Sequence, residues 1–407
     1  MMNHTTALRE LATKLLDDYK AGSSFFFASP YRTILAEGVF ATVEHNQVES
    51  FSELVHAVLN NAKQASHHNP IVVGALPFDR QRPVQLVVPQ ESRIADCLQF
   101  DAQDQVQLSS TLTYEMKPVP SPSEYMRGVE QGVEKIKAGD LKKIVLSRSL
   151  DLNSPEKVNI QKILRDLAKH NKHGYTFAVD LPKSEEEKNS DTAPQRSRTL
   201  IGASPELLVS RNGMQVVSNP LAGSRPRSED PAEDKRRAEE LLSSAKDLHE
   251  HAVVVEAVAV ALRPYCRILH VPEKPSLINS ETMWHLSTEV KGELFDTSVS
   301  SLELALALHP TPAVCGTPTE KAREAIKEIE PFDRRFFTGM LGWSDLNGDG
   351  EWIVTIRCAE IEENSLRLFA GAGIVAESKP VEELAETSAK FRTMLRAMGL
   401  NNELLEG

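Results

Sequence analysis

Residues 340–374 read MLGWSDLNGDGEWIVTIRCAEIEENSLRLFAGAGI, and this stretch decides the expected fold class. Its apolar runs at 340–344, 351–361 and 365–370 are separated by turn-forming residues, which predicts three consecutive strands joined by tight turns. Tight turns connect antiparallel strands, because parallel strands need long crossover connections. With the helices expected elsewhere, the stretch predicts an α+β fold with mainly antiparallel sheets rather than a doubly wound parallel sheet.

The turn between the first two of these strands contains Asp345-x-Asn347-x-Asp349-Gly350, which copies the first half of an EF-hand loop. Position twelve of such a loop needs a bidentate Glu, and the residue here is Ile356. Because the flanking residues alternate as strand residues do, the turn is predicted to be a hairpin rather than a calcium site.

Outside this stretch, strands and helices alternate along the chain. Apolar alternation and turn residues predict strands at 24–28, 71–78, 84–89, 143–148, 175–181 and 198–209. Apolar residues at helical spacing predict helices at 7–20, 123–138, 157–170, 232–263, 298–308, 319–328 and 380–398. We expect a polar and proline-rich linker at 101–122, an exposed flexible loop at 183–197 and a glycine loop at 371–373.

The composition disfavours several classes of protein. A length of 407 residues is ample for one large domain or two ordinary ones, and 41% apolar with 26% charged residues is usual for a soluble chain. The formal net charge of −12 argues against nucleic acid or an anionic membrane as the main partner. We find neither a membrane-spanning apolar run nor a signal-peptide pattern, so a cytoplasmic location is expected. The four cysteines form no CxxC motif and are expected to be free thiols: Cys97, Cys266, Cys315 and Cys358.

Two acidic pairs lie far apart in the chain, each within a predicted helix. Asp247 with Glu250, and Glu383 with Glu386, are spaced i, i+3, so each pair places two carboxylates on one helical face. Two such faces turned toward each other would bind a hard dication through oxygen ligands, and Mg²⁺ is the expected ion. The alternative is that both pairs are solvated faces, which the many Lys and Glu residues around Asp247 favour.

Four further residues could carry chemistry. Lys143 opens an apolar strand, and enclosure in a pocket would destabilise its charged form and let it act as a base; the alternative is a solvated lysine with a salt partner. Glu206 follows a Ser-Pro bend and could be kept protonated as a general acid, or could be an ordinary turn carboxylate. Arg357 ends a strand and could bind a substrate carboxylate or phosphate, or form an internal salt bridge. Lys390 could bind a second anionic group, or pair at i, i+4 with Glu386 on the surface.

Several strings together resemble the chorismate-utilising enzymes. They occur in the same order as in that family: KIVLSR at 143–148, IGASPE at 201–206, LAGSR at 221–225, AKDLHEH at 245–251, HPTPA at 309–313 and GAGIV at 371–375. FFFASP at 25–30 is similar too. The chain is most similar to the isochorismate synthases of the 2,3-dihydroxybenzoate siderophore branch, relatives of anthranilate synthase component I and salicylate synthase.

The resemblance implies a domain organisation and a fold. Residues 1–407 would form a single chorismate-binding domain, with a more variable part at 1–120 and the catalytic core at 121–400. The implied fold has two large antiparallel sheets packed face to face, with helices outside.

The resemblance also implies roles for the charged residues. Glu250 and Glu386 would bind Mg²⁺, with Asp247 and Glu383 behind them or joining through water. Lys143 would activate water as the base, and Glu206 would protonate the leaving hydroxyl as the acid.

The remaining roles concern the substrate. Arg357, Lys390 and the backbone from Gly371 to Gly373 would hold the enolpyruvyl carboxylate of chorismate. Gly223 and Ala313 would line the end of the pocket that holds the ring carboxylate. His285 matches a position near the reacting hydroxyl.

The implied activity is that of an isomerase, an isochorismate synthase that adds water at C2 of chorismate and releases the C4 hydroxyl. Because water is the nucleophile, no glutamine amidotransferase subunit is expected, and we expect a monomer. The nearest alternative is a salicylate synthase, which would go on to eliminate pyruvate. A further alternative, from a different class, is a non-catalytic metabolite-binding protein that kept the pocket.

Overall fold

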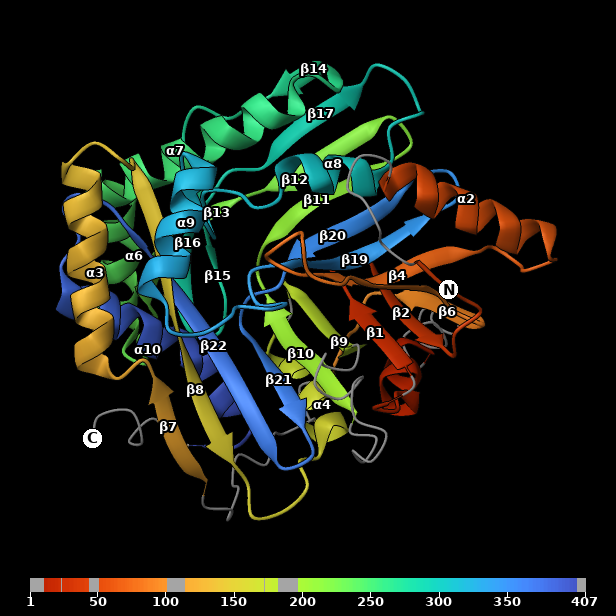
Figure 1. Cartoon of the computed structure of the whole chain (residues 1–407), viewed down its shortest axis with the longest axis horizontal. Coiled ribbons are helices and arrows are strands. Elements are labelled where there is room, and N and C mark those ends of the chain that lie inside the picture. Colours follow the sequence, from red (N-terminus) through yellow and green to blue (C-terminus); the bar gives the residue numbers. More distant parts are fainter. Residues whose placement is uncertain are drawn as a thin grey trace.

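The computed structural model describes residues 11–22, 24–43, 51–100, 114–171, 173–181 and 197–400. Within these ranges every strand pairing is antiparallel, and the strands form two large sheets and one small one (Figure 1). The predicted α+β class with mainly antiparallel sheets is confirmed, whereas the small third sheet was not foreseen. The flexible loop expected at 183–197 lies, apart from Ser197, outside the described residues.

The sheets differ in size, and the largest includes the longest strands. In the described chain the ten-stranded sheet has the order β18 (Gly316–Thr317), β8 (Lys143–Asn153), β22 (Ser365–Ile374), β21 (Cys358–Glu362), β10 (Arg198–Ser204), β9 (Tyr175–Leu181), β1 (Ser24–Ala28), β2 (Arg32–Glu37) and β6 (Glu91–Asp96), with β7 (Glu115–Val119) also paired to β8. The nine-stranded sheet has the order β14 (Cys266–His270), β17 (Val290–Leu294), β12 (Gln215–Asn219), β11 (Leu207–Asn212), β20 (Gly350–Val354), β19 (Met340–Asp345), β4 (Ile71–Leu76), β5 (Gln85–Val88) and β3 (Ala41–Thr42). The small sheet consists of β13 (Leu221–Pro226), β16 (Met283–Ser287) and β15 (Ser276–Asn279).

Helices lie on the outside of the sheets, as Figure 1 shows. They are α2 (Phe51–Gln64), α3 (Pro122–Lys137), α4 (Ile160–His170), α6 (Pro231–Ser243), α7 (Ala245–Leu262), α8 (Ser301–Leu308), α9 (Thr319–Ile329) and α10 (Pro380–Ala397), with a further helical segment at 11–18. Among the described residues, none of the helices combines the length and the apolar character needed to cross a bilayer.

The two large sheets pack face to face around an apolar core. Aromatic and branched side chains from both inner faces interdigitate, as is usual for packed sheets. They include Phe25, Phe27, Phe177, Leu200 and Phe369 from the ten-stranded sheet and Val73, Leu341, Trp343 and Ile353 from the nine-stranded sheet. Helices α4 and α10 cover the outer face of the larger sheet, and α2, α7 and α8 cover that of the other.

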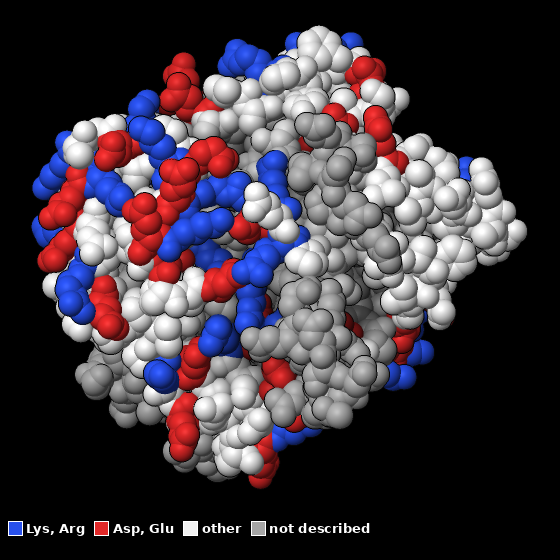
Figure 2. Space-filling model, viewed as in Figure 1, with Lys and Arg blue, Asp and Glu red and all other residues white. Residues whose placement is uncertain are grey.

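Figure 2 shows one face of the molecule, on which acidic and basic side chains are intermixed over α3 and α9. One such pair, Lys135 with Glu328, joins these two helices at 2.7 Å. Exposed pairs of this kind contribute little stability, so the apolar contacts of α3 and α9 with β8 hold the helices in place.

The hairpin predicted around residues 345–350 is confirmed. Strands β19 and β20 pair directly, and the carboxylate of Asp345 accepts backbone hydrogen bonds from Asn347 and Asp349, each of 2.9 Å. Asp349 in turn accepts a 2.7 Å bond from the backbone of Gly213. These acidic side chains stabilise a turn.

Two predictions of a single strand are wrong, because each of these segments contributes to both large sheets. The segments expected as single strands, 198–209 and 351–361, each divide into two, because the chain crosses from one large sheet to the other within them. The first crossing is at Pro205 and Glu206, and the second ends at Arg357, which has a φ of +52°. The backbones at the two crossings are bonded to each other: the carbonyl of Glu206 accepts from Val354 at 3.2 Å, and that of Arg357 from Ala203 at 3.1 Å.

Three further expectations need correction. The helix expected at 232–263 divides at Ser244, whose extended backbone ends α6 and whose side chain caps α7 by accepting from the backbone of Asp247. The glycine loop expected at 371–373 is part of β22 and pairs with β8. Part of the linker expected at 101–122 forms β7, and residues 101–113 lie outside the described chain.

Candidate active site

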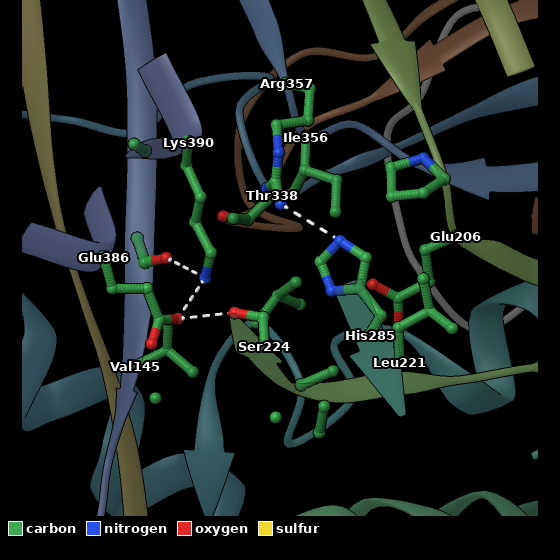
Figure 3. Close-up of a pocket in the computed structure, with 18 of the residues that line it drawn as sticks. Val145, Glu206, Leu221, Ser224, His285, Thr338, Ile356, Arg357, Glu386 and Lys390 are labelled. Carbon is green, nitrogen blue, oxygen red and sulfur yellow. Dashed lines mark hydrogen bonds and ion pairs between the residues drawn. The ribbon is translucent and has the colours of Figure 1, made fainter. Parts of the chain in front are cut away.

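A pocket with about 620 Å³ of empty space lies where both large sheets, the small sheet, α7 and α10 meet. Ten of the residues predicted for the site line it: Glu206, Gly223, Glu250, His285, Ala313, Arg357, Gly371, Gly373, Glu386 and Lys390. Figure 3 shows labelled side chains from separate elements converging on one space. A concave site lined by a few convergent charged groups is typical of a small-molecule site. Lys143, Asp247 and Glu383 lie behind the lining residues.

Glu206 reaches the pocket because the chain bends there between β10 and β11. Its backbone N–H donates to Oγ of Ser204 at 3.2 Å, and that hydroxyl donates to the carbonyl of Val354 at 2.7 Å. The side chain is only 3% exposed, and this burial raises the pKa of Glu206 to about 7, although a backbone hydrogen bond and nearby cations oppose the shift. The carboxyl can therefore hold a proton near neutral pH, as a general acid must.

Lys143 is completely buried at the start of β8. Its Nζ lies 2.9 Å from Oε1 of Glu250, close enough for an ion pair, although the angle is not that of a hydrogen bond. Glu250 lines the pocket and Lys143 does not, so Lys143 lies behind the carboxylate of Glu250.

Position 373 is a glycine because the side chains of Glu250 and Lys143 lie directly against it. A Cβ atom added at this position would lie 2.1 Å from Oε1 of Glu250 and 3.0 Å from Cε of Lys143. Gly371 is similar, since a Cβ there would lie 2.6 Å from Oγ of Ser147. The glycines of β22 therefore allow a carboxylate, a lysine and a serine to approach the strand closely.

The two acidic pairs do not form one four-carboxylate cluster. Asp247 binds Arg225, with a closest distance of 2.7 Å, and Glu383 binds Lys246 of α7 at 2.7 Å. In the part of the chain that the structure describes, no group of three or more His, Cys, Asp and Glu side chains is arranged to hold a metal ion. The inner carboxylates, Glu250 and Glu386, line the pocket, while the outer ones serve as salt-bridge partners.

The pKa values of the two α10 carboxyl groups, Glu383 and Glu386, shift in opposite directions. Burial and the neighbouring charge of Glu386 raise the pKa of Glu383 to about 7. Burial acts on Glu386 as well, but its 2.6 Å ion pair with Lys390 outweighs it, and the pKa of Glu386 is lowered. Ser224 also donates to Glu386 at 3.0 Å (Figure 3).

The two inner carboxylates suit a Mg²⁺ ion. Mg²⁺ is usually held by one or two carboxylates, with waters and substrate oxygens completing its shell. Glu250 and Glu386 come from different helices, line one pocket and supply hard oxygen atoms. Their chemistry fits such an ion without ligation by Asp247 or Glu383.

Arg357 supplies positive charge, and no carboxylate among the described residues forms a salt bridge with it. Its side chain is 6% exposed, its Nε has no hydrogen-bond partner among the described residues, and its Nη2 donates to Nε2 of His285 at 3.4 Å. Burial lowers the pKa of Arg357 to about 10, so the guanidinium stays charged at neutral pH. Burial also lowers the pKa of His285 well below its usual value, which keeps this ring neutral and able to accept that bond.

Lys390 completes the positive side of the pocket. Its Nζ donates to the carbonyl of Gly371 at 2.8 Å and pairs with Glu386. The predicted i, i+4 pair therefore exists, but within the pocket rather than on the surface. In Figure 3, Arg357 and Lys390 enter the same space from different elements.

Among the lining residues with polar side chains, sequence reasoning missed Ser224 and Thr338. Ser224 lies in the LAGSR string that was noted for its resemblance, and its place beside Gly223 was the available signal. Thr338 lines the pocket with a φ of +57°, which no local pattern in the sequence indicates.

A buried carboxyl group, a lysine, and an arginine without a salt-bridge partner among the described residues surround one pocket, and such a set suits a small anionic ligand. The chain belongs to the chorismate-binding enzymes: the family model described as "Chorismate binding enzyme" matches residues 83–399.

Full-length relatives narrow the comparison to one kind of enzyme. The chain is 62% identical over 406 residues to isochorismate synthase DhbC of Bacillus subtilis, covering 99% of this chain and 100% of that one. It is 42% identical over 412 residues to the vibriobactin-specific isochorismate synthase of Vibrio cholerae, covering 100% and 99%. The crystal structure of a putative 2,3-dihydroxybenzoate-specific isochorismate synthase, DhbC, from Bacillus anthracis superposes with a TM-score of 0.90 at 73% identity, covering 96% of this chain and 100% of that one.

Proposed function

We propose that this protein is an isochorismate synthase that serves a 2,3-dihydroxybenzoate pathway. It would convert chorismate to isochorismate by adding water at C2 and releasing the C4 hydroxyl. The observation that carries the proposal is that the protonatable Glu206 shares a pocket with Arg357, which forms no salt bridge within the described residues. The chain is also 62% identical to a named isochorismate synthase over 406 residues.

The proton transfers fall to two side chains. Lys143 is the proposed base that takes a proton from the attacking water as the neutral amine, and its complete burial supports this role because burial disfavours the charged form of a lysine. Glu206 is the proposed acid that donates a proton to the departing hydroxyl, which its raised pKa supports. The ring double bonds then shift while one hydroxyl replaces another.

The carboxylates of chorismate need two separate positive sites. Arg357 and Lys390 would bind the enolpyruvyl carboxylate, together with the backbone from Gly371 to Gly373. His285 accepts from Arg357 and would lie near the reacting hydroxyl. Fixing both ends of the substrate orients its ring between base and acid, which removes much of the entropic barrier to reaction.

The ring carboxylate would lie near Gly223 and Ala313, which also line the pocket. Glu250 and Glu386 would hold Mg²⁺ there, and the ion would supply positive charge that neutralises and orients this carboxylate. Because water is the nucleophile, the proposal needs no ammonia-supplying subunit.

Product analysis tests the proposal. Purified protein is incubated with chorismate and MgCl₂, and the products are separated by chromatography, since chorismate and isochorismate are isomers. Isochorismate is the expected product. Salicylate with released pyruvate would instead identify a salicylate synthase, and unreacted chorismate that nevertheless binds would identify a non-catalytic binding protein.

A further inference from the structure

Arg148 is a buried arginine whose side chain joins β8 to α10. It is 4% exposed, and burial lowers the pKa of Arg148 below its usual value. In the part of the chain described here, its hydrogen bonds go to two hydroxyls and a carbonyl rather than to a carboxylate. A buried guanidinium without an acidic partner is destabilising, so we expect Arg148 to be kept for the geometry that its hydrogen bonds enforce.

The contacts of Arg148 span one turn of α10. Its Nε donates to Oγ1 of Thr387 at 2.9 Å, and its Nη2 donates to Oγ of Ser388 and to the carbonyl of Leu384 at 3.4 Å. The guanidinium also lies 5.2 Å from the ring centre of Phe391, the next turn of the same helix. Four residues of α10 are therefore held by one side chain.

This turn of α10 is a place where the helix could bend. Both hydroxyls, of Thr387 and Ser388, donate back to the carbonyl of Leu384 at 2.9 Å. Such back-bonding within a helix slightly destabilises it and often bends it. The guanidinium binds all three groups at once and so fixes their arrangement.

The residues held by Arg148 alternate with residues of the site. Glu386 immediately precedes Thr387, and Lys390 lies one turn beyond, next to Phe391. The two side chains that α10 sends into the pocket are thus on the turn that Arg148 fixes. Lys143 lies on the same strand as Arg148, so β8 provides both the proposed base and this support.

We propose that Arg148 is a positioning residue, which sets the rotation of α10 relative to β8 so that Glu386 and Lys390 face the substrate. The inference rests on the proposed function, because it names chorismate as the ligand that Lys390 helps to hold. It predicts that loss of the guanidinium weakens substrate binding even though Arg148 itself does not line the pocket.

The test compares Arg148→Met and Arg148→Lys with wild type. Chorismate affinity is measured by calorimetry, and kcat and KM by product formation, all with MgCl₂. We expect the Met variant to lose about a hundredfold in kcat/KM, mostly through a higher KM and a matching rise in Kd. The Lys variant should recover part of this loss, because an ammonium can still donate to the two hydroxyls.

Arg367→Met is the matched control. Arg367 lies on β22 and pairs with Asp151 of β8 at 2.7 Å, so it also joins strands of this sheet, but to no part of α10. It should lower the melting temperature without changing KM. A folded Arg148→Met protein with unchanged Kd and KM would overturn the inference.

A second variant covers the case in which Arg148→Met does not fold. Thr387→Val with Ser388→Ala removes both hydroxyls that accept from the guanidinium and keeps Arg148 itself. It should raise the Kd for chorismate in the same direction, and an unchanged Kd would overturn the inference. Wild type measured alongside separates the two proposals, because failure of wild type to bind or convert chorismate would refute the proposed function itself.

Discussion

Glu206→Gln gives a quantitative prediction about the proposed acid. The structure raises the pKa of Glu206 from 4.5 to about 7, a change of about 2.5 units, and each unit corresponds to about 1.4 kcal/mol. Ionised Glu206 therefore destabilises the folded protein by about 3 kcal/mol relative to an ordinary carboxylate. The side chain is almost fully buried, so solvent screening does not reduce this figure much.

The direction with pH follows from the raised pKa. Glu206 costs nothing below pH 4.5, where both the folded and the unfolded chain carry the proton. As pH rises toward about 7, the unfolded chain releases this proton first, and stability is lost until Glu206 ionises in the folded protein as well. Glutamine does not titrate, so the variant should gain about 3 kcal/mol relative to wild type between these two pH values.

Urea unfolding of both proteins at several pH values measures this difference. The same pKa predicts that kcat/KM of wild type falls above pH 7, because the acid form of Glu206 is lost, and that the Gln variant has little activity at any pH. A stability difference that does not change with pH would show that Glu206 ionises normally, and the assignment of the acid would fail.

Four further predictions concern the rest of the pocket. Lys143→Ala should lower kcat by about a hundred- to ten-thousandfold while chorismate still binds in calorimetry; a near-normal rate would exclude Lys143 as the base. Arg357→Gln should raise the Kd for chorismate by about ten- to a hundredfold, because a charged hydrogen-bond donor is lost; unchanged affinity would place the carboxylate elsewhere. Gly373→Ala should weaken Mg²⁺ binding in titration calorimetry by about tenfold or more, since its Cβ would meet Glu250, and normal binding would contradict the assigned metal position. EDTA should stop turnover and added Mg²⁺ restore it, whereas turnover that survives chelation would remove the metal from the proposal.

The fold class could be predicted from one stretch because hairpin turns are local. Asn347 and Asp349 indicate a turn by their own chemistry, and the strands on either side alternate visibly. The crossings of the chain between sheets could not be predicted in the same way. At Arg357 the strand-like pattern continues through the crossing, and at Glu206 the Ser-Pro bend is visible but does not reveal that the two halves pair in different sheets.

In the site, too, features set by neighbouring residues could be predicted, whereas contacts between residues far apart in the sequence could not. The spacing of each acidic pair correctly placed two carboxylates on a helix, but spacing carries no information about Arg225 or Lys246, which bind the outer carboxylates. Gly371 and Gly373 of β22 were predicted to form a loop because glycine is common in turns. Their true reason, the approach of Glu250 to Gly373, involves residues more than a hundred positions apart.

Turnover in ¹⁸O-labelled water tests the central claim most directly, namely that solvent water enters at C2 as the C4 hydroxyl leaves. Isochorismate formed by the wild-type protein should carry one solvent oxygen, located at C2 by mass spectrometry of its fragments, and Lys143→Ala should form almost none. Isochorismate without the label, or no isochorismate at all, would contradict the account.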